Sequence, residues 1–331
     1  MHFFLHGVDF CAIITENPGG GSVKYFAPAY YPYFRCIADA CRHSCCIGWE
    51  IDIDPVTREK YRTVEGPIGR RLAEEIIDGE PSCFRLGENE RCPFLREDGL
   101  CTLILELGED SLCDICALHP RFRNYFSDRA EIGLGLCCEA AAELILTRGG
   151  ETELIPVDED EEATFPLSPE EEALLACRAE LLAICRNEDC GFAEKTERLL
   201  NAVEADLPSR AWTEWRAVYA DLERLDTAWD KLLSRLGRKS APIGSEWDIP
   251  LSHLLGYFLF RHLPGALDAE DPDAAIRARV CFAVLSAEII RKIFAGGEQS
   301  MEALGDIARQ YSAEVEYSDE NLGRVLELLG E

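Results

Sequence analysis

The chain has 331 residues, 47% of them apolar, and is long enough to bury one large core or two moderate ones. Its sixteen cysteines are therefore not a substitute for a core. The formal net charge of -29 at pH 7 argues against a nucleic acid partner, because phosphate backbones repel so acidic a protein. We interpret the acidic surface as solvated, with attraction of a lysine-bearing protein substrate as the alternative.

The first residues, MHFFLHGVDFCAII, contain no Lys or Arg and are interrupted by His6 and Asp9, which does not fit a secretory signal. The apolar stretch at residues 251–260 is about half as long as a membrane span. We therefore expect a cytoplasmic protein without a membrane partner, in which clustered cysteines bind metal more often than they form disulfides.

Residues 1–22 end in NPGGGS, just before the aromatic-rich stretch KYFAPAYYPYF. Three consecutive glycine codons are purine-rich, as a ribosome-binding site is. We expect Val23 to be the true start, and residues 1–22 to be a translated leader or a disordered extension.

Residues 23–150 are expected to form a cysteine-rich domain. Residues 54–64 and 68–79 have the pattern of short helices, the second ended by Gly79 and Pro81. Residues 83–104 resemble a hairpin that turns at Asp98-Gly99. The prediction is a mostly helical domain with a small β-hairpin near the cysteines.

Residues 151–172 are rich in acids, contain no base and predict an exposed linker that ends where a helix begins at Ser168. Beyond it, residues 173–331 are expected to form a helical domain, because strand-like alternation is scarce. Apolar residues recur there at helical spacing in residues 171–187, 212–237, 273–296 and 300–314. The predicted fold class is mainly α, with a cysteine-rich metal-binding N-terminal domain followed by a helical bundle.

Eleven of the sixteen cysteines lie between Cys36 and Cys138. If the segment from Asp39 is helical, Cys41 and Cys45 share a face and Cys46 is turned away by about 100°. Cys36 would reach the same site from the preceding loop. A second group consists of three pairs: Cys92 and Cys101, Cys113 and Cys116, and Cys137 and Cys138.

Soft thiolates at this density select zinc, copper(I) or iron–sulfur clusters. The spacing matches neither the paired knuckles of a zinc ribbon nor the ferredoxin run, so the residues leave the metal open. We predict metal binding, with inert core thiols and a few redox-active ones as the alternative.

Four blocks in order carry a resemblance to a known family: CIADACRHSCCIGW, CPFLREDGLC, CALHPR and LGLCCEAAAELIL. Together they resemble the flagellin lysine N-methylases, the FliB-like proteins. The resemblance covers residues 25–146, and residues 246–263 extend it weakly into the second half.

The resemblance implies an iron–sulfur cluster, 4Fe–4S with zinc as the alternative, and methyl transfer from S-adenosylmethionine to a lysine of flagellin or a flagellin-like protein. The cluster would have a structural role. Cys113 and Cys137 are additions to the family pattern and are therefore weaker candidates for metal ligands. Glu139-Ala140 stands where the family pattern has Pro-Glu, which leaves the role of an acid at this place in doubt. The metal ligands that the resemblance implies are Cys36, Cys41, Cys45, Cys46, Cys92, Cys101, Cys116 and Cys138.

Two other functions compete with methyl transfer. Related small cysteine-cluster proteins share the style of the first block, which suggests a non-catalytic iron- or zinc-binding or redox-sensing protein. The third possibility is a structural module whose helical half recruits a partner.

Methyl transfer needs a neutral lysine amine held in line with the sulfonium methyl. Walls for the lysine stem are available in Tyr30, Tyr31, Tyr33 and Trp49, although these aromatics also suit packing around a metal. No glycine-rich turn follows a convincing strand, so the sequence leaves the catalytic and cofactor-binding residues unknown. The Cys-x3-Cys-x2-Cys pattern of radical chemistry is absent.

The remaining candidates have ordinary structural explanations beside functional ones. His43 and His119 are possible ligands, and packing is the favoured role. Arg121 and Arg123 would bind a carboxylate or form ion pairs. Cys177, Cys185 and Cys281 lie on apolar helix faces and are expected in the core.

Overall fold

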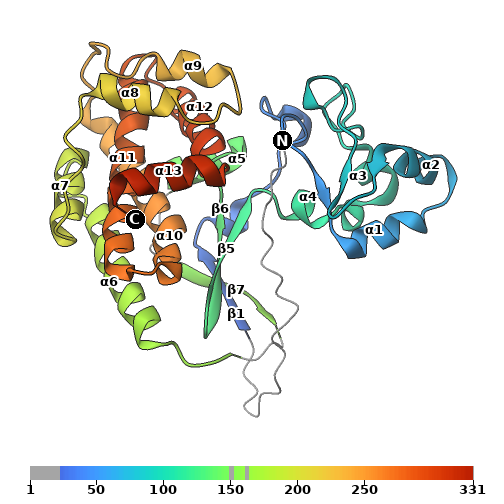
Figure 1. Cartoon of the computed structure of the whole chain (residues 1–331), viewed down its shortest axis with the longest axis horizontal. Coiled ribbons are helices and arrows are strands. Elements are labelled where there is room, and N and C mark those ends of the chain that lie inside the picture. The colour runs from blue at the N-terminus through green and yellow to red at the C-terminus, as the bar shows by residue number, and fades with distance from the viewer. Residues whose placement is uncertain (1–22, 149–152, 161–163, 331) are drawn as a thin grey trace. The chain divides into compact units, whose positions relative to one another are not determined.

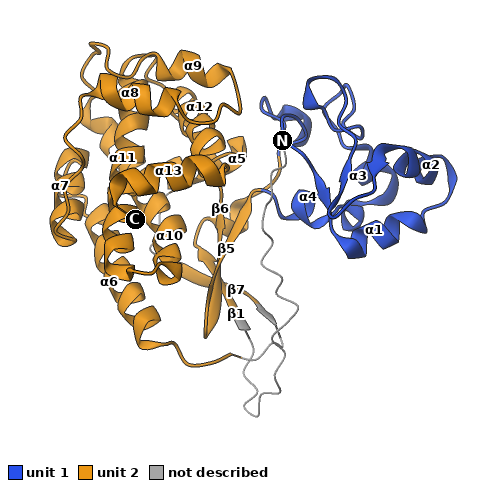
Figure 2. Cartoon of the chain, viewed as in Figure 1, with its two compact units in different colours: residues 1–21, 37–119 blue, residues 22–36, 120–331 orange. Residues whose placement is uncertain are grey.

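The computed structural model describes residues 23–148, 153–160 and 164–330, so the expected leader at 1–22 lies outside the described residues. The chain divides into two compact units (Figure 2). The cysteine-rich unit comprises residues 37–119, and the helical unit comprises residues 23–36 together with the chain from 120 onward. The predicted division at residues 151–172 therefore differs from the structure.

The cysteine-rich unit combines four short helices with a three-stranded antiparallel sheet in the order β2-β4-β3. The elements of this unit are β2 (Asp52–Ile53), α1 (Pro55–Arg62), α2 (Gly66–Glu75), β3 (Ile76–Ile77), β4 (Ser82–Phe84), α3 (Thr102–Leu107) and α4 (Asp114–Leu118). The two predicted helices are confirmed by α1 and α2. Helix α1 begins where the Asp54 side chain accepts a hydrogen bond from the Thr57 N–H, 2.8 Å away.

The predicted hairpin at residues 83–104 is only partly formed. Gly99 takes a left-handed conformation (φ 81°), and the Leu100 carbonyl accepts from the Arg96 N–H across the turn. Pairing then stops after a single bridge between Leu95 and Cys101. The strands β2, β3 and β4 are each two or three residues long, too short to produce a recognisable alternation.

The helical unit contains a four-stranded sheet in the order β5-β6-β1-β7 (Figure 1). Strand β1 (Val23–Pro28) runs parallel to β6 (Arg129–Leu134) and antiparallel to β7 (Leu154–Asp160), while β5 (Arg121–Phe126) and β6 form a hairpin. The sequence does not predict this sheet, because β1 pairs with strands that lie more than a hundred residues further along the chain.

Strand β7 corrects the predicted linker. Residues 154–160 pair with β1 at the edge of the sheet, with a register shift next to Pro156, and acids discourage further pairing. The predicted helix start is confirmed, because Ser168 and Glu171 form a capping box at the beginning of α6.

Helices form the rest of this unit, namely α5 (Glu139–Arg148), α6 (Pro169–Arg186), α7 (Phe192–Ala202), α8 (Trp212–Ala220), α9 (Ala228–Leu233), α10 (Asp248–His262), α11 (Pro272–Ala295), α12 (Met301–Tyr311) and α13 (Asp319–Leu329). Helices α10 and α11 are buried along most of their length and form the centre of the core. Helix α10 also packs on the sheet, since the Phe122 ring of β5 lies 5.9 Å from the Phe260 ring. The mainly α class is confirmed at this level.

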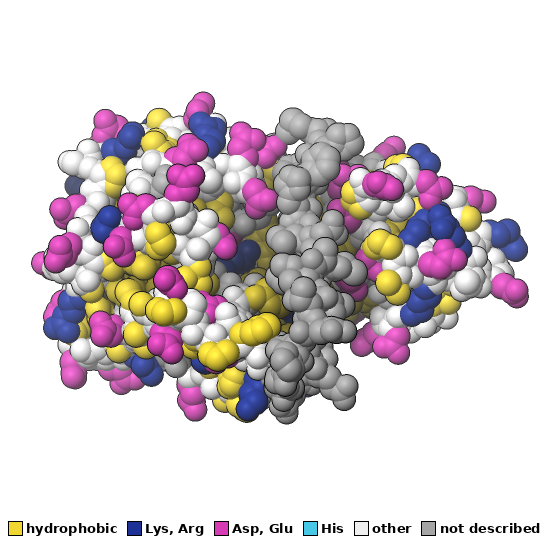
Figure 3. Space-filling model, turned by 60° about the horizontal axis from the view of Figure 1, so that its bottom comes forward, with side chains coloured by type: hydrophobic (Ala, Val, Ile, Leu, Met, Phe, Trp, Pro, Cys, Tyr) yellow, Lys and Arg dark blue, Asp and Glu magenta, His cyan; other side chains and the backbone are white. Residues whose placement is uncertain are grey.

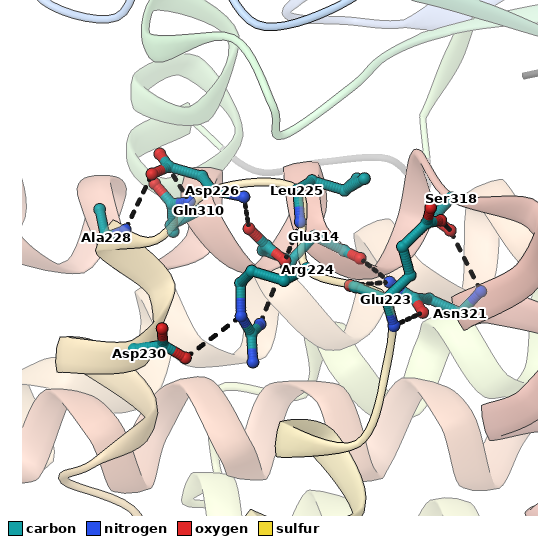
Figure 4. Close-up of polar contacts among 10 residues, drawn as sticks. All are labelled: Glu223, Arg224, Leu225, Asp226, Ala228, Asp230, Gln310, Glu314, Ser318 and Asn321. Carbon is teal, nitrogen blue, oxygen red and sulfur yellow. Dashed lines mark hydrogen bonds and ion pairs between the residues drawn. The ribbon is translucent and has the colours of Figure 1, made fainter. Parts of the chain in front are cut away.

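Two predicted helical segments are interrupted. Residues 212–237 split into α8 and α9, and α12 continues into a π-helix, Ser312–Glu316. The Glu314 carboxylate explains the first break, because it accepts from the N–H groups of Leu225 and Asp226 and pairs with Arg224 at 3.2 Å (Figure 4). The π-helix thus holds the loop between α8 and α9.

None of the described helices is both long enough and apolar enough to cross a membrane.

Candidate functional site

Five cysteines lie in or against the core of the cysteine-rich unit. Cys92 and Cys113 belong to its buried core, and Cys46, Cys101 and Cys116 pack against that core. Four of the five are predicted ligands. Cys113 is the exception, and it is completely buried.

Tertiary pairing brings these thiols together. The Cys92 N–H donates to the Cys46 carbonyl at 2.9 Å, next to a bridge between Ile47 and Arg91. Cys101 forms the other bridge of this region, with Leu95.

Helix α4 carries the last pair, Cys113 and Cys116, one turn apart. It is tied to α1 because the Asp54 carboxylate, which caps α1, also accepts from the Asp114 N–H at 3.0 Å. One side chain therefore fixes the beginnings of both helices.

The predicted helical face for Cys41 and Cys45 is wrong. Only Ala38–Ala40 forms a short 3-10 helix, and residues 41–49 consist of turns and bends. The turns place the Cys45 thiol in a hydrogen bond with Cys46. The helical spacing argument fails because the chain must turn sharply for Cys46 to reach Cys92.

The five thiols have different protonation tendencies. Hydrogen bonding from Cys45 lowers the pKa of Cys46 to about 7, against the effect of burial. Hydrogen bonding from Cys116 lowers the pKa of Cys113, while the same bond and burial raise that of Cys116. Burial raises the pKa of Cys101, and that of Cys92 to about 12. Cys46 and Cys113 are thus the two thiols closest to the thiolate form.

A buried tyrosine lies beside this group. The Tyr61 hydroxyl donates to the Ser111 carbonyl at 2.7 Å. Burial raises its pKa, and negative charge on Cys113, Cys116 and Cys101 raises it further. Negative charge on these thiols would therefore keep Tyr61 protonated.

The other predicted ligands are less closely grouped. Cys41 is half-buried and Cys45 exposed, both in the cysteine-rich unit. Cys36 and Cys138 belong to the helical unit, where Cys36 is exposed and Cys138 packs against the apolar core. The structure thus brings together Cys46, Cys92, Cys101 and Cys116 of the predicted set.

The four aromatic residues predicted to line a lysine channel are divided between the two units. Tyr30 is buried in the core of the helical unit, Tyr31 accepts a hydrogen bond from Arg121 at 2.8 Å, and Tyr33 is 60% exposed. In the cysteine-rich unit, the Trp49 indole donates to the Cys45 carbonyl.

The remaining candidates are divided between the units. His43 lies in the turns of the first cysteine block, and the His119 ring lies 5.8 Å from the Trp49 ring. Arg123 is half-buried on β5.

Of the expected core thiols, Cys185 and Cys281 are buried, as predicted, whereas Cys177 is half-buried at the edge of a cleft. The helix pattern identifies the face on which Cys177 lies but does not show where the surrounding helices end.

Thiolates of this kind suit zinc or an iron–sulfur cluster. Within the described ranges, no three Cys, His, Asp or Glu side chains lie close enough together to bind one metal ion.

The connection from β6 to α5 is the described segment that most resembles a glycine-rich turn for binding S-adenosylmethionine, but it does not form such a turn. Strand β6 leads through Gly135 into α5, but the chain fills both nearby glycine positions itself. A Cβ on Gly133 would lie 2.1 Å from the Phe122 ring, and one on Gly135 would lie 2.2 Å from the Tyr317 hydroxyl. These two glycines therefore leave no space for a cofactor.

Sequence reasoning treated Cys113 as a weaker candidate ligand, and the structure places it in the core of the cysteine-rich unit. The Cys-x-x-Cys spacing was visible, but its position in the core was not, since this depends on how α4 attaches to α1. It also missed a buried group in the helical unit, in which Glu316 accepts from Tyr257 at 3.0 Å and lies 2.6 Å from the His262 ring nitrogen. No signal in the sequence links residues so far apart.

The two units define a cysteine-rich protein on a mainly α-helical framework. The chain is 32% identical over 126 residues to the lysine-N-methylases of Salmonella choleraesuis (strain SC-B67) and Salmonella typhimurium (strain LT2). It is 31% identical over 126 residues to the flagellar biosynthetic protein FliU of Salmonella muenchen. The chain belongs to the family of these proteins, as the resemblance of the cysteine blocks predicted.

The match covers 36% of this chain, 75% of FliU and 31% of each lysine-N-methylase. The matched region is thus about a third of the length of the two lysine-N-methylases. No family model matches the chain. No solved structure matches it either.

Proposed function

We propose that the protein is a protein-lysine N-methyltransferase that uses S-adenosylmethionine to methylate flagellin or a flagellin-like protein. The observation that carries the proposal is the sequence relationship to two proteins named lysine-N-methylase. The relationship to a flagellar biosynthetic protein supports the substrate class.

The thiol group would hold an iron–sulfur cluster through Cys46, Cys92, Cys101 and Cys116, with Cys113 as a fifth thiol beside them. When bound, such a cluster would tie together the segments that carry the thiols. This fits a structural role, because the buried core of the unit consists of only twelve residues, two of them cysteines.

The charge of the protein supports a basic substrate. Asp and Glu side chains are spread over both units on the face shown in Figure 3. With a net charge of -29, the surface attracts a lysine-bearing segment and speeds its encounter with the protein at low salt.

The test is to incubate anaerobically purified protein with methyl-labelled S-adenosylmethionine and flagellin, and to map labelled lysines by mass spectrometry. The expected result is methyl-lysine in flagellin that depends on the protein. A matched control replaces flagellin with a lysine-rich protein unrelated to flagella. Absence of labelled lysine, with the metal content intact, would contradict the proposal.

The alternative is a non-catalytic iron- or zinc-binding or redox-sensing protein. The observation that favours it is the hydrogen-bonded Cys113–Cys116 pair, since such Cys-x-x-Cys pairs are common in redox proteins. Analysis of iron, acid-labile sulfide and zinc in the purified protein shows whether it contains an iron–sulfur cluster or zinc. Stoichiometric zinc without sulfide, together with no methyl transfer, would favour the alternative.

A further inference from the structure

A cleft of about 400 Å³ lies in the helical unit, apart from the thiol group. Its walls come from α6, the end of α7, the 3-10 helix Leu263–Asp268 and the beginning of α11. The apolar part of the lining includes buried Leu174 and half-buried Ile276. This volume falls in the range typical of small-molecule sites.

Three charged side chains line the same cleft: Glu170 on α6, and Asp273 and Arg277 on α11. All three are exposed, and within the described residues none of them forms an ion pair or a side-chain hydrogen bond. The cleft therefore offers two carboxylates and one guanidinium that the protein does not use internally.

Helix electrostatics explains the two acids but not the arginine. Glu170 and Asp273 lie in the first turns of their helices, where a negative charge is favourable. Arg277 lies one turn further along α11, beyond the first turn to which that effect is confined. It is well placed for an i,i+4 pair with Asp273, yet the pair is not formed. The exposed Arg277 guanidinium is therefore available to a carboxylate of a ligand.

The charge pattern is complementary to one kind of ligand. S-adenosylmethionine carries an α-ammonium group, a sulfonium centre and one carboxylate, which are two positive charges and one negative. The cleft presents two negative charges and one positive beside an apolar wall. A peptide lysine would use the carboxylates but leave Arg277 without an anion.

We propose that this cleft binds S-adenosylmethionine, with Arg277 on the ligand carboxylate and with Glu170 and Asp273 near its two cationic centres. The adenosine would lie against the aliphatic wall formed by the half-buried Val203 and Ile276. The inference rests on the proposed function for the choice of ligand, but the site itself is derived from the cleft.

The test is equilibrium binding of labelled S-adenosylmethionine to the full chain. Arg277→Gln is expected to weaken binding about tenfold, as the loss of one charge-assisted hydrogen bond would. Arg186→Gln is the matched control, because Arg186 is exposed at the other end of α6 and outside the cleft. This control is expected to change binding less than twofold.

A second variant tests the contacts to the cationic centres. The double variant Glu170→Gln with Asp273→Asn is expected to weaken S-adenosylmethionine more than S-adenosylhomocysteine, because the latter lacks the sulfonium charge. Glu172→Gln, on the exposed side of α6, is the control. Thermal unfolding of each variant shows that it is folded.

Binding and methyl transfer are measured separately, so the two proposals fail differently. Unchanged affinity in both cleft variants, or no binding to the unaltered chain, overturns the cleft assignment. Variants that lose affinity while the unaltered chain transfers no methyl group to flagellin support the cleft and contradict the methylase proposal. Methylation whose KM for S-adenosylmethionine is unchanged in Arg277→Gln supports the methylase and rejects the cleft.

Discussion

The two units bury different kinds of side chain. The cysteine-rich unit has a small core in which five thiols take part. The helical unit has a large apolar core that includes α10 and α11, and buried charges such as Glu131 and Arg178 pair within it, at 2.7 Å. A large apolar core is sufficient by itself to keep a unit folded. A small core with many thiols gains most stability from a group that binds those thiols.

The largest expected effect follows from the proposed cluster: without the thiols that would bind it, the cysteine-rich unit should lose order. In the double variant Cys92→Ser with Cys116→Ser we expect residues 37–119 to lose amide hydrogen-exchange protection. Structural metal sites contribute roughly 10 kcal/mol in small domains, more than this core alone provides. Exchange mass spectrometry measures each unit separately.

The matched control is Cys281→Ala, which removes a buried thiol of α11. It should reduce protection only in the helical unit. If the double serine variant keeps full hydrogen-exchange protection in residues 37–119, the apolar core of the cysteine-rich unit is sufficient to keep it folded. The two units would then not differ in their need for a bound group.

The second effect concerns the charges of the helical unit. Glu316 is almost fully buried and interacts with Tyr257, Arg261 and His262. Replacing it by Ala leaves the Arg261 charge without its partner, and we expect a loss of about 3–5 kcal/mol in the free energy of unfolding. Urea unfolding measures this loss.

Exposed Glu327 on α13 provides the comparison for Glu316. Glu327→Ala should change the free energy of unfolding by no more than about 0.5 kcal/mol. Equal effects of the two substitutions would mean that the buried network contributes little to stability.

Smaller still is the pH dependence of the helical unit. Burial lowers the pKa of His262 and of His253. The unfolded chain therefore takes up protons as the pH falls through about 6.5, while the folded state still holds both rings neutral. Stability should decrease between pH 7 and 5, and the thermal unfolding midpoint measures this decrease.

His262→Gln should make that decrease shallower, because one of the two titrating rings is removed. The comparison is made as a difference between the variant and the unaltered chain, so that other titrating groups cancel. Identical pH profiles would show that His262 does not contribute.

The smallest effect is expected in the cysteine-rich unit. Tyr61→Phe removes the hydrogen bond to the Ser111 carbonyl and should cost about 1 kcal/mol. Tyr33→Phe, at a side chain that is 60% exposed, serves as the control and should be neutral. Hydrogen exchange in residues 37–119 measures the first substitution, and no change there would remove Tyr61 from the interactions that hold the unit together.

Local signals predicted the helices well. Asp54 and Pro55 start α1, Ser168 and Glu171 start α6, and each signal is a direct contact between neighbours in the chain. The sheet of the helical unit was missed because β1 pairs with residues more than a hundred positions away. Its edge strand β7 was also disguised by acids, which suit both an exposed linker and an exposed edge.

The sequence by itself determined the family, through the spacing of its cysteine blocks, and the helices, through caps and apolar periodicity. Only the tertiary structure decided which thiols meet. Cys46 reaches Cys92 through a backbone bridge, and Cys113 enters the core because Asp54 holds both α1 and α4. The physical reason is that helix caps and periodicity depend on near neighbours, whereas a shared core depends on distant segments that pack together.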